Sequence, residues 1–133
     1  MPGLVTDTHT LVWYLMRSPK LSAAASARIN AAVAAGEPLF VPTVCIVEII
    51  YLVEKRRLPT LARERLTKHL DLSDSDLRLV PLDRWVAERI EAIPRDQVAD
   101  MPDRIIAATA LHLGVPLVTR DGHIRASGID TVW

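Results

Sequence analysis

Short apolar runs alternate along this chain with longer segments in which apolar residues recur every three or four positions. The short runs are typical of buried strands, and the longer spacing is typical of helices packed on one side. The first pattern predicts strands at 3–6, 39–41, 77–80, 115–119 and 130–133. The second pattern, counted with its capping residues, predicts helices at 8–16, 22–35, 43–55, 60–70, 83–93 and 100–113.

The alternation of strands and helices predicts an α/β fold with three layers, in which helices flank a mostly parallel central sheet on both faces. Thr43 stands where its side chain can cap a helix. Segment 43–55 is apolar on nearly every side, which predicts a largely buried helix. The chain has 133 residues and no long linker or repeat, so we expect a single domain over 1–133.

Charge and cysteine usage narrow the class of protein only a little. Lys plus Arg equals Asp plus Glu, at 16 each, so no overall basic signal announces a nucleic-acid partner. The single cysteine, Cys45, excludes an internal disulfide framework and lies in an apolar stretch, where we expect a small core residue. No apolar run approaches the roughly 20 residues that span a bilayer. Together these features predict a cytoplasmic protein that does not enter a membrane.

Candidate chemistry lies in the acidic residues. Asp7 and Asp121 follow predicted strands, Asp103 opens a predicted helix one turn after Asp100, and Glu48 is the only charge between residues 41 and 53. Sites in open α/β sheets form beyond the carboxyl ends of strands, and carboxylates gathered there repel one another unless a cation lies between them. Oxygen-only ligands suit Mg²⁺ or Mn²⁺. The pattern therefore favours a divalent-metal site and phosphoryl chemistry.

Each acid also has a purely structural interpretation. Glu48 would then pair with an arginine from elsewhere in the fold. Asp7 and Asp103 would serve helix starts, and Asp121 would be a turn residue before Gly122. The histidines are scattered without zinc-ligand spacing, and phosphate-loop, dinucleotide-binding and nucleophile-elbow motifs are absent. It is the combination of acids that favours the metal site.

Four segments, in this order, resemble the PIN-domain ribonucleases and most closely the VapC toxins of toxin–antitoxin pairs. They are Leu-Val-Thr-Asp-Thr at 4–8, Val-Pro-Thr-Val-Cys-Ile-Val-Glu-Ile at 41–49, Asp-Met-Pro-Asp-Arg-Ile-Ile-Ala-Ala-Thr-Ala at 100–110 and Leu-Val-Thr-Arg-Asp at 117–121. The resemblance spans essentially the whole chain. It implies a PIN-like parallel sheet flanked by helices.

The resemblance also implies roles for individual residues. The catalytic, metal-binding acids would be Asp7, Glu48, Asp103 and Asp121, with Asp100 as a further metal-side acid and Thr119 and Thr43 in support. Arg104 and Arg120 neighbour two of these acids and are candidate RNA contacts, although solvated arginines are as ordinary an interpretation. The function implied is a Mg²⁺- or Mn²⁺-dependent endoribonuclease, the toxin of a type II pair. Its partners would be an RNA substrate, a cognate antitoxin and a second copy in a homodimer or hetero-oligomer.

Two other functions stay open at this point: a housekeeping RNA-processing nuclease without an antitoxin, and a catalytically silent module that binds RNA or protein. The basic segment 55–68 is either a surface that follows phosphates or a solvated helix face. Trp13 and Tyr14 belong either to the core or to a groove that takes an antitoxin helix. Trp85 is expected in the core, and Trp133 has no predicted place.

Overall fold

A five-stranded parallel sheet forms the centre of the molecule in the computed structural model, which describes residues 1–133. Its strands are β1 (Leu4–Thr6), β2 (Leu39–Pro42), β3 (Leu77–Val80), β4 (Leu117–Val118) and β5 (Thr131–Val132). They lie in the order β3-β2-β1-β4-β5, and all four neighbouring pairs are parallel. The predicted parallel sheet is therefore confirmed.

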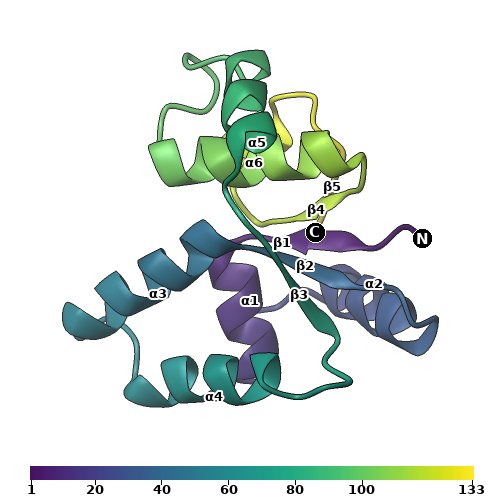
Figure 1. The fold of residues 1–133 in the computed structure, drawn as a ribbon, viewed down its shortest axis with the longest axis vertical. Helices are drawn as coiled ribbons and strands as arrows, with labels where there is room; N and C mark the ends of the chain where they lie inside the picture. Colours follow the sequence, from purple (N-terminus) through teal and green to yellow (C-terminus); the bar gives the residue numbers. More distant parts are fainter.

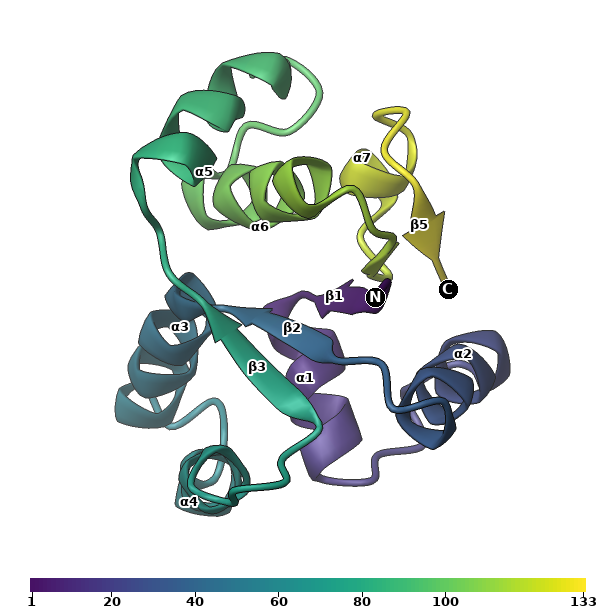
Figure 2. The same cartoon turned by 45° about the vertical axis from the view of Figure 1, so that its right-hand side comes forward.

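Helices cover both faces of this sheet. They are α1 (Thr8–Leu15), α2 (Ala23–Ala34), α3 (Thr43–Glu54), α4 (Thr60–Leu70), α5 (Arg84–Arg89), α6 (Met101–Leu113) and α7 (Gly122–Arg125), with a 3-10 turn η1 (Ile90–Ala92) after α5. Helices α1 to α4 lie on one side, and α5 and α6 lie on the other, as Figures 1 and 2 show. The predicted three-layer α/β/α architecture is confirmed.

The core lies where α6 and α1 press on the two faces of β1. All three residues of β1 are buried, as expected for a strand covered on both faces. The middle of α6 is buried from Ile105 to Ala110, and its alanines let the helix approach the strand closely. Gly3 precedes the strand with φ +126°, and a Cβ there would lie 2.5 Å from the Pro38 carbonyl oxygen. Only glycine fits that approach.

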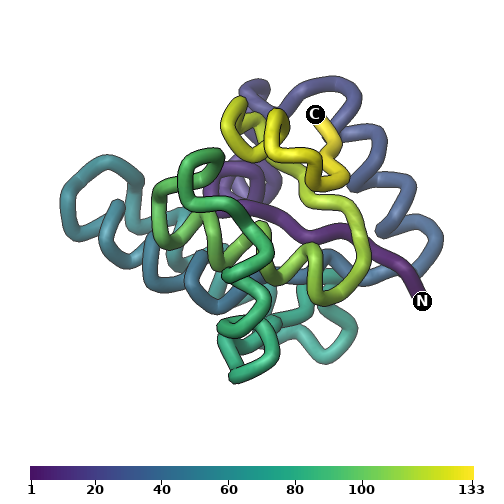
Figure 3. The backbone as a smooth tube through the Cα atoms, turned by 90° about the horizontal axis from the view of Figure 1, so that it is seen from above, coloured from purple at the N-terminus to yellow at the C-terminus, as the bar shows by residue number.

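The strand order reverses between β1 and β4, and open α/β sheets form their sites at the carboxyl edge beside such a switch point; the region at this edge between the exits of β1 and β4 is called the crevice below. In Figure 3, β1 runs from the N-terminus toward the side of the molecule occupied by α3. Helices α1, α3 and α7 begin at this edge because each follows a strand. Helix α6 precedes β4 and runs back along the sheet, so its N-terminus lies at the same edge.

Two local predictions are wrong. Helix α3 buries only Cys45 and Ile49, because it lies at the side of the sheet and exposes one apolar face to solvent. Trp85 is 61% exposed instead of packed in the core. Asp121, for which a turn was the structural alternative, instead caps α7.

No helix is long and apolar enough to cross a membrane.

Candidate functional site

Asp7 lies at the bottom of the crevice and is 9% exposed. Its Oδ1 accepts a hydrogen bond from the Thr10 backbone N–H at 2.9 Å, which caps α1. Its Oδ2 accepts one from the Thr119 hydroxyl at 2.6 Å. The Thr119 oxygen in turn accepts the Asp121 backbone N–H at 3.0 Å. These bonds join the exits of β1 and β4 and fix the Asp7 carboxylate in one orientation.

Glu48 reaches the crevice from the second turn of α3. The Thr8 hydroxyl donates to its Oε1 at 2.5 Å. The interpretation of Glu48 as a partner for an arginine is wrong, since the one ion pair in the structure joins Arg84 and Glu88. Glu48 is therefore a half-buried carboxylate with a hydroxyl partner and no neutralising cation from the protein.

Asp103 lies in the first turn of α6, where the Asp100 side chain caps the helix by accepting the Asp103 backbone N–H at 3.2 Å. The pKa of Asp103 is raised to about 7, first by partial burial and then, in decreasing order, by the negative charges of Asp100, Asp121, Glu48 and Asp7. The carboxylates that the sequence scatters over 115 positions thus repel one another across one crevice. No basic side chain forms an ion pair with any of these acids.

Cys45 lies beneath the carboxylates and is fully buried. Its thiol points to the Thr6 carbonyl oxygen at 3.9 Å. Burial raises the pKa of the Cys45 thiol far above its ordinary value, and the negative charges of Asp7, Glu48 and Asp103 add to the effect. A thiol that stays protonated is no nucleophile, so the interpretation of Cys45 as a small core residue fits its surroundings.

The donor set fits a hard divalent cation in its chemistry and in its charge. All five acids offer oxygen ligands, and the raised pKa of Asp103 reflects negative charge that a cation would offset. The side chains do not converge on one point, however: no group of three or more His, Cys, Asp or Glu residues is gathered closely enough to hold an ion. The five acids thus share a region of negative charge without forming a coordination cage.

The two candidate RNA-binding arginines have different surroundings. Nη2 of Arg104 donates to the carbonyl oxygens of Ile90 at 3.1 Å and Ile93 at 2.9 Å, so this side chain ties η1 to α6. That structural task leaves Arg104 a weaker candidate for RNA. Arg120 is exposed, and its guanidinium lies over the Trp13 ring, 4.8 Å from the ring centre.

Two threonines change the expected set of supporting residues. Thr43 is the first residue of α3 and gives no side-chain cap, because Pro42 occupies the capping position. The cap predicted at Thr43 is therefore wrong. Thr8, which the sequence did not indicate as a site residue, donates its hydroxyl to Glu48. Its place directly after Asp7 was the only signal in the sequence that could have pointed to it.

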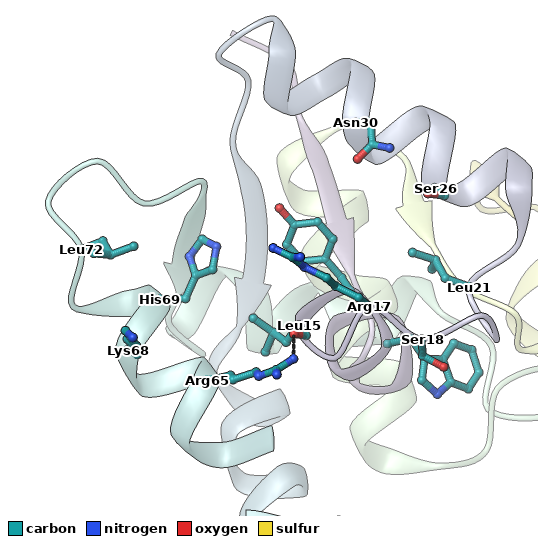
Figure 4. A pocket seen from close by; sticks show the side chains of 12 residues that line it. Leu15, Arg17, Ser18, Leu21, Ser26, Asn30, Arg65, Lys68, His69 and Leu72 are labelled. Atoms are coloured by element: carbon teal, nitrogen blue, oxygen red, sulfur yellow. Dashed lines mark hydrogen bonds between the residues drawn. The ribbon is translucent and has the colours of Figure 1, made fainter. Parts of the chain in front are cut away.

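A separate pocket of about 840 Å³ lies between α1, α2 and α4, away from the carboxylates. Trp13, Tyr14 and Leu21 supply much of its apolar lining, and Arg17 and Lys68 supply positive charge. Figure 4 shows Leu21, Arg17 and Lys68 around the opening. It also shows the hydrogen bond that Arg65 donates to the Leu15 carbonyl oxygen, at 3.0 Å. No acidic residue lines the pocket.

The fold and the crevice together define a doubly wound α/β protein with an acidic site at its topological switch point. The family model described as "PIN domain" matches residues 4–128, so this chain belongs to the PIN domain family. The resemblance stated from the sequence motifs is confirmed.

Known proteins agree with this assignment. Ribonuclease VapC22 of Mycobacterium tuberculosis is 30% identical over 131 residues, covering 95% of this chain and 92% of the relative. VapBC2 from Rickettsia felis, solved with a promoter DNA fragment, has a TM-score of 0.71 at 14% identity, covering 97% of this chain and 96% of that one. DNA-bound VapBC from Salmonella typhimurium has a TM-score of 0.68 at 21% identity, covering 98% and 97%. At these identities the solved structures support the fold.

Proposed function

We propose that this chain is a Mg²⁺- or Mn²⁺-dependent endoribonuclease, a single domain over residues 1–133 that acts in the cytoplasm. The observation that carries the proposal is the uncompensated repulsion around Asp103, whose pKa is raised to about 7 by burial and by four other carboxylates. A structural cluster would be expected to recruit an arginine, and none of these acids has one. Similarity to a ribonuclease over nearly the whole chain gives the substrate class.

In this proposal Asp7, Glu48 and Asp103 hold the cation, with Asp121 and Asp100 beside them. The bound cation supplies an activated water and offsets charge on the phosphate. The chain's own contribution is orientation. Thr119 and Thr10 fix both oxygens of Asp7, and Thr8 fixes Glu48. Carboxylates held in this way need little rearrangement when substrate arrives.

The test is cleavage of structured RNAs by purified protein in Mn²⁺ or Mg²⁺. Asp103→Asn keeps the shape of the side chain and removes its charge, and Asp96→Asn is a matched control in an exposed loop. We expect cutting at defined sites that EDTA and Asp103→Asn abolish and Asp96→Asn leaves intact. Equal cutting by wild type and Asp103→Asn would identify a contaminant. Failure on all RNAs, including total RNA from the source cell, would favour the silent binding module.

We further propose that the enzyme is the toxin of a type II pair and that its antitoxin occupies the pocket between α1, α2 and α4. The solved relatives include a toxin–antitoxin complex from Klebsiella pneumoniae, with a TM-score of 0.65. An apolar lining with a basic rim suits an amphipathic helix carrying acidic residues. The exposed apolar face of α3, with Val47 at 52% and Tyr51 at 57% exposure, is a candidate surface for a homodimer or hetero-oligomer.

Co-production with the protein encoded beside this gene tests the partner. We expect the two chains to co-purify and RNA cleavage to be inhibited. Leu72→Asp, at the pocket, should weaken the complex, whereas Leu111→Asp, at a comparable exposure outside it, should not. A nuclease with no neighbouring partner gene would favour the housekeeping enzyme. An unchanged complex with Leu72→Asp would exclude this pocket as the binding site.

A further inference from the structure

Arg120 is held in a different way from Arg104, the other candidate RNA-binding arginine. It lies between Thr119, which bonds Asp7, and Asp121, so its backbone is fixed by the site itself. Five acids surround this part of the fold, yet Arg120 forms no ion pair with any of them. Its guanidinium instead lies over the Trp13 ring, 4.8 Å from the ring centre.

Stacking on an aromatic face leaves the edge of a guanidinium free. The five N–H donors of arginine point outward in the plane of the group, and a ring beneath that plane does not engage them. No hydrogen bond from the Arg120 side chain to the protein competes for these donors, in contrast to Arg104 with its two carbonyl partners. Arg120 is therefore an exposed, oriented cation with unused donors at the rim of an acidic crevice.

Trp13 is itself held in place by the end of the chain. The Trp133 ring lies 5.7 Å from the Trp13 ring, centre to centre, at an interplanar angle of 54°. Parallel pairing of β5 with β4 brings Trp133 there, and the Thr119 backbone N–H donates to the Val132 carbonyl oxygen at 3.1 Å. Thr119 and Val132, which directly precede Arg120 and Trp133, are thus hydrogen-bonded to each other. The second ring restricts Trp13, and Trp13 restricts the guanidinium.

The location indicates which phosphate Arg120 would meet. Trp13 is six residues beyond Asp7 along α1, a rise of roughly 9 Å at 1.5 Å per residue. Arg120 stacks on a residue more than one helical turn beyond Asp7 and forms no ion pair with the acids, so its guanidinium lies beside the carboxylates and is not bound among them. A cation beside the carboxylates suits a phosphate that neighbours the one at the carboxylates.

We propose that Trp13 and Trp133 are positioning residues that hold Arg120 as an anchor for an RNA phosphate flanking the cleaved bond. The inference rests on the proposed function for its substrate class. As a consequence, Arg120 and the two tryptophans set the affinity for RNA, whereas the carboxylates set the rate of cleavage.

The experiment measures binding of a fluorescent single-stranded RNA in EDTA across a range of salt concentrations, so that no cleavage is needed. Variants are Arg120→Ala, Trp133→Ala, the double variant and Trp133→Phe. The matched control is Trp85→Ala. Trp85 carries another stacked arginine, Arg84, whose guanidinium lies 5.1 Å from the ring centre, and both residues are far along the chain from the site. Thermal unfolding of each variant establishes that it is folded.

Arg120→Ala should weaken binding about tenfold at low salt and reduce the slope of log affinity against log salt by about one. Trp133→Ala should weaken binding roughly two- to fivefold, the scale of a lost cation–π contact, and Trp133→Phe should restore most of it. In the Arg120→Ala background, Trp133→Ala should change affinity little. Trp85→Ala should have no effect, and the active variants should change KM with kcat nearly constant.

Equal weakening by Trp133→Ala with and without Arg120 would overturn the proposal, as would an unchanged salt slope in Arg120→Ala. If Trp133→Ala does not fold, Arg120→Lys carries the test. Lysine keeps the charge but lacks the planar group that stacks on Trp13. The proposal therefore expects Arg120→Lys to bind RNA more weakly, whereas a simple charge effect expects unchanged binding. Binding that follows this pattern without any cleavage would refute the nuclease and leave the anchor intact, and cleavage without the pattern would refute the anchor alone.

Discussion

Replacing Asp103 by asparagine is expected to stabilise the protein in the absence of divalent metal while abolishing its activity. The substitution preserves the shape of the side chain and removes one of five mutually repelling charges. It sacrifices no hydrogen bond to the Asp103 side chain, because the bond at this position is donated by its backbone N–H to Asp100. The gain in stability therefore reports the electrostatic strain at the crevice.

The magnitude follows from the pKa of Asp103. Its ordinary value is 3.8 and its value in the folded protein is about 7, a difference equivalent to about 4 kcal/mol at 1.36 kcal/mol per pKa unit. Asp103 is only partly buried, so solvent screening reduces this free-energy difference. The charged Asp103 also interacts favourably with the positive end of the α6 dipole, which offsets a further ~0.5 kcal/mol of the repulsion. We expect a net gain of about 1–2 kcal/mol above pH 7.

The sign of the pH dependence is fixed by the direction of the pKa change. The folded state holds the Asp103 proton more tightly than the unfolded chain, so stability falls as pH rises from about 4 to about 7. Urea unfolding of both proteins in EDTA at pH 4.5, 6 and 8 measures the difference. The advantage of Asp103→Asn should grow with pH and level off above pH 7. A variant that is less stable at pH 8, or an advantage independent of pH, would refute this account.

Three further changes test other contacts. Thr119→Val removes the hydroxyl that bonds Asp7, and urea unfolding should show a loss of about 2–3 kcal/mol, against a smaller loss for Thr109→Val, whose hydroxyl bonds only its own helix. An equal loss in both would contradict the special role of Thr119. Mn²⁺ at 100 times its Kd should stabilise wild type by about 2.7 kcal/mol, seen as a higher unfolding temperature, and should have much less effect on Asp7→Asn. Equal unfolding temperatures in Mn²⁺ and EDTA would argue against a metal site. Gly3→Ala should lower the free energy of unfolding by about 2 kcal/mol or more, because residue 3 has φ +126° and the added Cβ would lie 2.5 Å from the Pro38 carbonyl oxygen. An unchanged urea midpoint would contradict that.

Local signals in the sequence predicted much of the fold. Ser22, Asp83 and Asp100, the first residues of three of the predicted segments, all cap helices with a side-chain oxygen, and Gly114, directly after the last predicted helix, ends α6 in the left-handed conformation. These features are predictable because a helix end requires particular side chains at particular positions. The final strand at the chain end was also predicted, and it pairs with β4.

Contacts between distant segments were much harder to predict. The segment of α3 is apolar on nearly every side, yet the helix is not enclosed, because its neighbours cover only the face carrying Cys45 and Ile49. Trp85 looks like a core residue by composition and lies at the surface beneath Arg84. An apolar side chain favours burial, but how far it is buried depends on where its helix or strand lies in the fold.

The sequence by itself determined the strands, most helix boundaries and the identity of the acids, because these depend on residue type and short-range spacing. The tertiary structure alone decided that acids from four separate segments repel one another across a single crevice and that Thr8 and Thr119 orient two of them. It also decided that Trp133 meets Trp13 beside Arg120. The physical reason is the strand order β3-β2-β1-β4-β5, which makes neighbours of β1 and β4 although more than a hundred residues separate them.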